Sequence, residues 1–163
     1  MLVSSPELAD KIARLKRRAK AAKVPVIYVN DNFGRWRSDF RALIEHCRNG
    51  KARSLIEQLY PEQADYFVLK PKHSGFFSST LETLLRYLGV RRLIITGIAG
   101  NFCVLFTAND AYMRDYELVV PSDCVISNTA KENKEALQLM KRYLKADTRR
   151  SQRISFRKRD GLR

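Results

Sequence analysis

The sequence is poor in cysteine and histidine, the residues on which disulfide-rich and metal-binding proteins depend. Its 163 residues include three cysteines, Cys47, Cys103 and Cys124, and two histidines. An odd and sparse set of cysteines does not form a disulfide scaffold, so we expect reduced thiols and a cytoplasmic location. His46 and Cys47 are adjacent, which is not a chelating interval, and His73 lies far from both. We therefore expect no metal and no other cofactor.

Long apolar runs are also absent. No stretch approaches the ~20 residues that a membrane span requires, and residues 1–6 lack the basic and then apolar layout of a signal peptide. We therefore expect no membrane partner. Hydrophobic residues make up 45% of the chain and charged residues 29%, which is the composition of a globular protein of one domain.

Acidic residues are scarce relative to basic ones. Thirty-one Lys and Arg against seventeen Asp and Glu give a net charge of +14, concentrated in residues 11–23 and in the tail, residues 149–163. Such an excess can serve a nucleic-acid partner, because neutralised phosphates supply affinity independent of sequence. A dedicated site would want interleaved aromatic residues, and the tail offers only Phe156. A solvated helix face followed by a basic tail is therefore the favoured interpretation.

Short apolar runs alternate with helical patterns along the chain, which predicts a parallel sheet covered on both faces. The predicted fold is α/β: one domain, Rossmann-like, with three α/β/α layers. Doubly wound folds usually begin with a strand, whereas this chain begins with a helix at Pro6. The predicted strands are residues 24–29, 66–69, 91–97 and 117–120, and the further helices are residues 40–48, 52–59, 79–88, 101–114 and 130–144.

Three segments follow predicted strands, at the sheet edge where open α/β folds bind ligands. They are residues 30–32, 70–74 and 97–103. Cys103 begins a predicted helix, whose positive end favours the thiolate, and Lys70 at a neighbouring strand end would favour it further. The alternative is that Cys103 is a small buried side chain, a common fate of free cysteine. The spacing alone leaves both interpretations open.

Several motifs resemble those of the isochorismatase-like cysteine hydrolases. They are VPVIYVNDNFGRW at residues 24–36, KPKHSGF at 70–76, GIAGNFCV at 97–104, TANDA at 107–111 and PSDCV at 121–125. The motifs arrive in the family's order, and the resemblance runs from about residue 8 to about residue 149. It implies a hydrolase domain over residues 1–148 and a basic C-terminal tail over residues 149–163.

The resemblance implies a role for each matching residue. Cys103 matches the nucleophile of the family's Asp-Lys-Cys triad, and Lys70 matches the lysine. Ile98 and Ala99 match the position of a cis peptide bond that shapes an oxyanion hole, to which Cys103 also contributes. Five residues are candidates for the substrate pocket: Asp31, Phe33, Trp36, His73 and Phe76. Asp31 has the alternative role of a turn residue, and Trp36 that of a packing or subunit contact.

The sequence also departs from the family. No stretch resembles the D-x-x-x-D-F segment that carries the family's catalytic aspartate, so we expect the family's first strand and its general base to be missing. The Asp-x-His motif with which nicotinamidase-like members bind zinc is missing too. The leading interpretation is a hydrolase that acts on a small amide or related substrate through a thioester-type intermediate. The alternatives are a catalytically impaired or non-catalytic truncated member acting as a binding, homo-oligomeric protein, and a basic nucleic-acid-binding protein.

Overall fold

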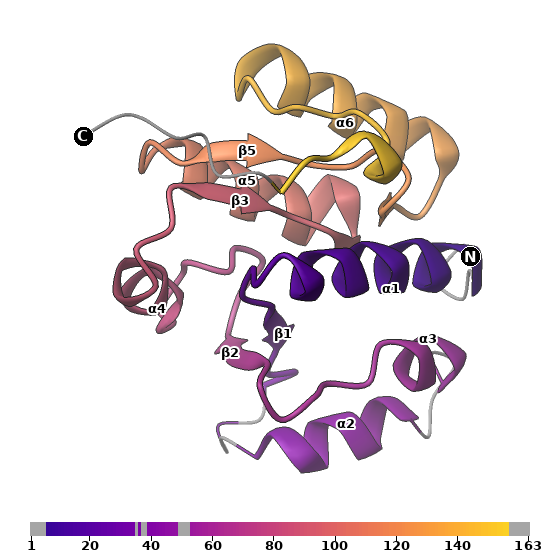
Figure 1. Ribbon diagram of the computed structural model, residues 1–163, viewed down its shortest axis with the longest axis vertical. Coiled ribbons are helices and arrows are strands. Elements are labelled where there is room, and N and C mark those ends of the chain that lie inside the picture. Colours follow the sequence, from indigo (N-terminus) through magenta and orange to yellow (C-terminus); the bar gives the residue numbers. More distant parts are fainter. Residues whose placement is uncertain (1–5, 35, 37–38, 49–52, 157–163) are drawn as a thin grey trace.

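The structure is a computed structural model that describes residues 6–34, 36, 39–48 and 53–156 (Figure 1). The helices are α1 (Pro6–Ala21), α2 (Phe40–Arg48), α3 (Arg53–Gln58), α4 (Leu81–Tyr87), α5 (Leu105–Tyr112) and α6 (Ala130–Tyr143). A π-helical segment, η2 (Gly100–Val104), precedes α5, and a 3₁₀ turn, η3 (Ser151–Arg153), follows α6. The strands are β1 (Ile27–Asp31), β2 (Tyr66–Lys70), β3 (Arg92–Ile94), β4 (Gly97–Ile98), β5 (Glu117–Val119) and β6 (Val125–Ile126). No described helix is long and apolar enough to cross a membrane.

The strands pair in parallel, which confirms the predicted α/β class. β1 pairs with β2, β3 with β5 and β4 with β6, each as a separate two-stranded unit among the described residues. The register sets Asp31, the last residue of β1, opposite Lys70, the last residue of β2. Because the pair is parallel, both side chains belong to its carboxyl end, where ligands bind in open α/β sheets.

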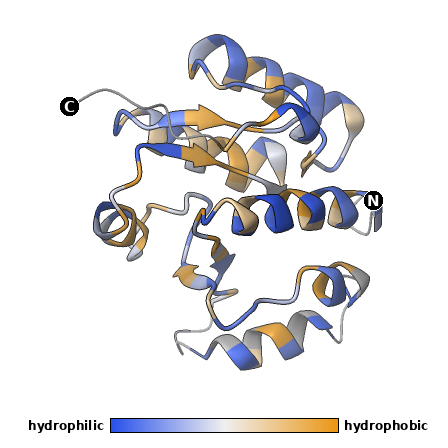
Figure 2. Ribbon diagram, in the orientation of Figure 1, coloured by the Kyte–Doolittle hydropathy of each residue, from blue (hydrophilic) through white to orange (hydrophobic). Residues whose placement is uncertain are grey.

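Alternate residues of β5 face two different layers of helices. Leu118 of β5 and Val120, the residue that follows β5, lie in a core cluster with buried side chains of α4, α5 and α6. Val119, between them, packs instead with Leu15 of α1 and with Cys124. This period of two is the ordinary alternation of a strand, and it shows helices on both faces, as the predicted three layers require. Figure 2 shows β3 and β5 as hydrophobic strands and α6 as a largely hydrophilic helix.

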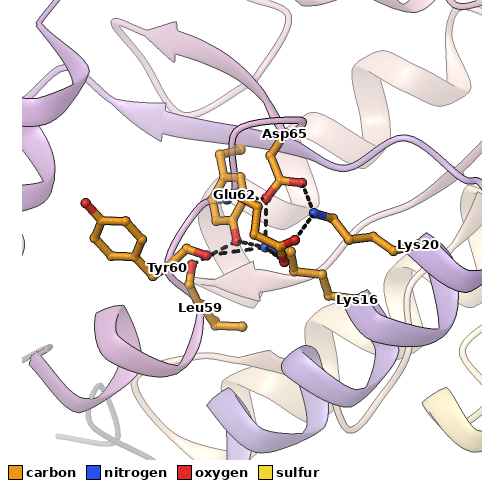
Figure 3. Close-up of polar contacts among 7 residues, drawn as sticks. Lys16, Lys20, Leu59, Tyr60, Glu62 and Asp65 are labelled. Carbon is orange, nitrogen blue, oxygen red and sulfur yellow. Dashed lines mark hydrogen bonds and ion pairs between the residues drawn. The ribbon is translucent and has the colours of Figure 1, made fainter.

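A buried carboxylate fastens α1 to the loop before β2 (Figure 3). Both oxygens of Asp65 bind lysines of α1: Oδ2 lies 2.7 Å from Lys16 Nζ and Oδ1 lies 2.7 Å from Lys20 Nζ. Burial alone would raise the pKa of Asp65, but the two lysines outweigh it and hold that pKa below its usual range. Burial likewise opposes the charge of Lys16, whose pKa is nevertheless raised by its bonds to Asp65 and to the Tyr28 hydroxyl.

The described part of the basic tail packs against the domain. Ile154 is 3% exposed and belongs to the cluster formed with Leu15 and Val119. The guanidinium of Arg18 donates to the carbonyl oxygens of Ser151, at 2.8 Å, and Ile154, at 2.6 Å. Ser151 and Ile154 therefore contact α1, whereas the rest of the predicted tail, residues 157–163, lies outside the described residues.

Candidate active site

Cys103 and Lys70 come from distant parts of the sequence and meet at the carboxyl edge of the strands. Lys70 Nζ lies 3.5 Å from Cys103 Sγ, and the lysine is 3% exposed. Cys103 is half-buried within η2, the segment that follows β4. A half-buried cysteine in contact with a buried ammonium is a candidate nucleophile.

Lys70 has two further partners besides the sulfur. Its ammonium lies 3.3 Å from Asp31 Oδ2 and donates to the Lys72 carbonyl oxygen at 2.8 Å. The other carboxylate oxygen of Asp31 accepts the backbone N–H of Phe33 at 2.7 Å. Asp31 thus joins the lysine, while it also closes the turn that follows β1.

The backbone before Cys103 has the cis peptide bond expected from the resemblance, between Ile98 and Ala99. The N–H groups of Phe102 and Val104 both donate to the Ala99 carbonyl oxygen, at 3.1 Å each. The second of these bonds spans five residues, which makes η2 a π-helical rather than an α-helical turn. The expected helix over residues 101–114 is therefore a π turn followed by α5.

The loop that follows Lys70, residues 71–80, is bonded to α5, the helix that continues from η2. The hydroxyl of Ser74 donates to the carboxylate of Asp110, and the N–H of Gly75 donates to Thr107 Oγ1 at 2.9 Å. Ser74 is itself buried and accepts the N–H of Phe76 at 3.1 Å. These bonds connect the loop that follows Lys70 to the helix that continues from the Cys103 segment.

The five candidate pocket residues have different surroundings. Asp31 lies beside Lys70, and His73 packs its ring against two phenylalanines near the cysteine. Phe33 and Trp36 are 57% and 83% exposed, on the segment that follows β1. Phe76 is 6% exposed and packs in the hydrophobic core against Tyr116, so its ring faces the interior of the domain.

Two aromatic residues near Cys103 did not figure among the sequence candidates. The His73 ring centroid lies 5.3 Å from that of Phe102 and 5.7 Å from that of Phe106. Both phenylalanines are more than two-fifths exposed. Phe102 and Phe106 are four residues apart, and residues at this spacing share a helix face. The spacing alone could therefore have indicated that both rings lie on the side of the helix near Cys103.

Cys124 has the surroundings of an inert thiol. It is fully buried, and burial raises its pKa to about 11, against the smaller opposing effect of the Ser151 hydroxyl. The side chain of Cys47 lies outside the described residues. Between the two described thiols, Cys103 is therefore the one whose environment suits a nucleophile.

The described residues hold no metal cluster at this site, and two surface hollows lie elsewhere on the domain. No three His, Cys, Asp or Glu side chains described in the structure gather as metal ligands would. Two surface hollows of about 400 Å³ and 410 Å³ adjoin each other along α6 and the segment after it, sharing Lys141 and Thr148. Their linings include neither Lys70 nor Cys103.

The chain belongs to the isochorismatase family. The sequence pattern that defines the isochorismatase domain family matches residues 3–151. The chain is similar to the uncharacterized isochorismatase family protein YaaI of Bacillus subtilis, with 45% identity over 91% of this chain and 82% of that protein. It is 43% identical to the ureidoacrylate amidohydrolase RutB of an Enterobacter species, over 47% of this chain and 34% of that protein.

Solved structures show the same fold. The N-carbamoylsarcosine amidase from Thermoplasma acidophilum superposes with a TM-score of 0.73 and 25% identity, over 91% of this chain and 85% of that one. The nicotinamidase from Staphylococcus aureus superposes with a TM-score of 0.71 and 24% identity, over 93% and 88% of the two chains. The chain thus has the fold of the isochorismatase family as well as its sequence.

Proposed function

We propose that this protein hydrolyses a small amide or a related substrate, with Cys103 as the nucleophile. The observation that carries the proposal is the 3.5 Å contact between Cys103 Sγ and the buried ammonium of Lys70. The names of three relatives, a ureidoacrylate amidohydrolase, an N-carbamoylsarcosine amidase and a nicotinamidase, support a carbon–nitrogen bond as the bond that breaks.

In the proposed reaction, Cys103 Sγ attacks the substrate carbonyl carbon while Lys70 stabilises the charge on sulfur. Backbone N–H groups near Ala99 and Cys103 hold the carbonyl oxygen as it becomes an oxyanion. The carbon–nitrogen bond then breaks, the proton that the thiol lost ends on the departing nitrogen, and a thioester remains. Water attacks the thioester, which releases the acid and restores the thiol. His73, Phe33 and Trp36 are the proposed contacts on the substrate side.

The first experiment is alkylation of the folded protein with iodoacetamide at neutral pH, followed by mass spectrometry. We expect Cys103 to react faster than the buried Cys124, and Lys70→Met to slow Cys103 without affecting Cys124. A screen of nicotinamide, N-carbamoylsarcosine and ureidoacrylate then follows, with Cys103→Ala as the inactive control. Equal alkylation rates at Cys103 and Cys124 would contradict the proposal. Hydrolysis by Cys103→Ala as fast as by the unsubstituted protein would contradict it too.

The divided sheet supports a second proposal, a self-associating binding protein. Among the described strands, β1 pairs only with β2 and β3 only with β5, and every residue of β1 and β3 is half-buried. Strand edges without partners favour association through added strands. Light scattering during gel filtration would show a homo-oligomer if this proposal holds and a monomer if it does not. An unreactive Cys103 in an oligomer would favour this function over hydrolysis.

A further inference from the structure

The ammonium of Lys70 has one hydrogen-bond acceptor for each of its three N–H bonds. A lysine ammonium carries three donors and no acceptor. The structure gives Lys70 three acceptors: Asp31 Oδ2 at 3.3 Å, the Lys72 carbonyl oxygen at 2.8 Å and Cys103 Sγ at 3.5 Å. When the first two acceptors each take one N–H bond, the third bond is directed at the sulfur.

The buried ammonium of Lys70 requires a negative charge nearby, because burial of an unpaired charge is strongly destabilising. The side chain is 4% exposed. Asp31 is the one acid that forms an ion pair with Lys70 among the described residues. The strand register keeps the two groups together, since Asp31 lies opposite Lys70 and the N–H of Asn32 donates to the Lys70 carbonyl oxygen at 3.0 Å.

The turn after β1 does not by itself require an aspartate. Asp31 Oδ1 accepts the N–H of Phe33, and in the same way Asn32 Oδ1 accepts the N–H of Gly34 at 3.0 Å. An asparagine at position 31 would make the first of these bonds equally well. Asparagine cannot supply the negative charge beside Lys70. The substitution Asp31→Asn therefore removes the ion pair with Lys70 and keeps the hydrogen bond to the N–H of Phe33.

We propose that Asp31 is the positioning residue of this site. Its carboxylate balances the buried charge of Lys70 and turns the ammonium so that one N–H bond points at Cys103 Sγ. The inference rests on the proposed function of Cys103 as a nucleophile, because it assigns Asp31 the task of holding the group that stabilises the sulfur. Asp31 acts on the substrate only through Lys70.

The ion pair itself is tested by a double-mutant cycle in urea with Asp31→Asn, Lys70→Met and both together. We expect Asp31→Asn to lower the urea midpoint when Lys70 is present, because it strands a buried charge, and to have almost no effect in the Lys70→Met background. Asp31→Glu keeps the charge and should retain most of the stability. Asp10→Asn, which removes the same charge from an exposed pair with Arg14, is the matched control.

The effect on Cys103 is tested by comparing iodoacetate, which is negatively charged, with neutral iodoacetamide. Asp31→Asn leaves the charge of Lys70 unbalanced beside the sulfur. We expect the ratio of the iodoacetate rate to the iodoacetamide rate at Cys103 to rise about two- to threefold, the effect in water of removing one negative charge up to about 7 Å away. The ratio should stay unchanged in Asp31→Glu and Asp10→Asn and should fall in Lys70→Met.

The outcomes separate this inference from the proposed function. If Cys103 reacts no faster than Cys124, the nucleophile proposal fails, while the urea cycle still decides whether Asp31 balances Lys70. Additive effects of Asp31→Asn and Lys70→Met overturn the inference, as does an unchanged reagent ratio in Asp31→Asn. If Asp31→Asn does not fold but the double variant does, the stranded charge is the cause and the ion pair is supported. If neither folds, the ratio in Asp31→Glu decides: a ratio that differs from that of the unsubstituted protein overturns the inference.

Discussion

Gly100 is the first residue of η2, and the structure has no room for a methyl group on its Cα. A Cβ built there would lie 2.7 Å from Val125 Cγ1, 2.7 Å from Asn133 Oδ1 and 2.8 Å from Ser127 Oγ. Since the optimum for such contacts is about 3.5–4.0 Å, each neighbour would have to move by more than about half an ångström. We therefore predict that Gly100→Ala destabilises the protein.

The neighbours of Gly100 cannot all move freely, because they are bonded to one another. The Ser127 hydroxyl donates to Asn133 Oδ1 at 3.0 Å and accepts the N–H of Asn101 at 3.1 Å. Asn133 Nδ2 in turn donates to the Val125 carbonyl oxygen at 3.2 Å. Overpacking of this kind costs about 1–3 kcal/mol, against about 0.4–1 kcal/mol gained by restricting the unfolded chain. The expected net loss is about 1–2 kcal/mol.

Urea unfolding followed by circular dichroism measures this loss. The matched control is Gly75→Ala, where a Cβ would meet flexible methyl groups of Leu81 and Val29 at 3.1 Å and of Thr107 at 3.3 Å. The control should cost less than about 1 kcal/mol, because these side chains need to give by only a few tenths of an ångström. A Gly100→Ala variant as stable as the parent, or less affected than Gly75→Ala, would refute the packing argument.

Three further predictions follow from buried and exposed groups. The lowered pKa of Asp65 means that its contribution to stability is complete above its ordinary value of 3.8 and is lost as the pH falls through the lower folded value. Asp65→Asn should therefore be less stable than the parent at neutral pH, with a gap that narrows below about pH 4 in urea titrations; a constant gap would contradict this. Cys124, with a pKa of about 11, is almost wholly protonated at neutral pH and should resist iodoacetamide until the protein unfolds; rapid labelling of the folded protein would show the burial to be wrong. Trp36 is 83% exposed, so Trp36→Ala should change the free energy of unfolding by less than about 0.5 kcal/mol, and a larger loss in the same assay would reveal a contact.

Most of the fold could be predicted, because its signals are local and periodic. Alternation of short apolar runs with helical patterns is enough to predict a parallel α/β sheet. The continuous strand expected over residues 91–97 was wrong, since it is divided into β3 and β4. Gly97, at φ +118°, adopts a backbone that other residues avoid, and the partner changes there from β5 to β6. Strand β6 has two residues, too few to leave a periodic signal.

The candidate site could be predicted in part. Strand ends that share an edge can be inferred from the order of elements, and the structure does bring Lys70 and Cys103 together there. Phe76 could not be assigned in the same way, because an aromatic residue beside a polar loop can face either the cleft or the core, and it faces the core. The ion pair of Asp31 with Lys70 depends on the strand register, which the sequence of neither strand contains.

The division of the sheet has a dynamic consequence for the site. Asp31 and Lys70 belong to the β1–β2 pair, whereas Cys103 follows β4, in another pair. Regions of a protein with few shared hydrogen bonds can open as units without global unfolding. An opening that broke the bonds of Ser74 to Asp110 and of Gly75 to Thr107 would separate sulfur from ammonium while each strand pair stayed intact. The population of the closed form would then set how much of the protein is reactive at any moment, and hydrogen exchange at the amide of Gly75, which donates to Thr107, would report it.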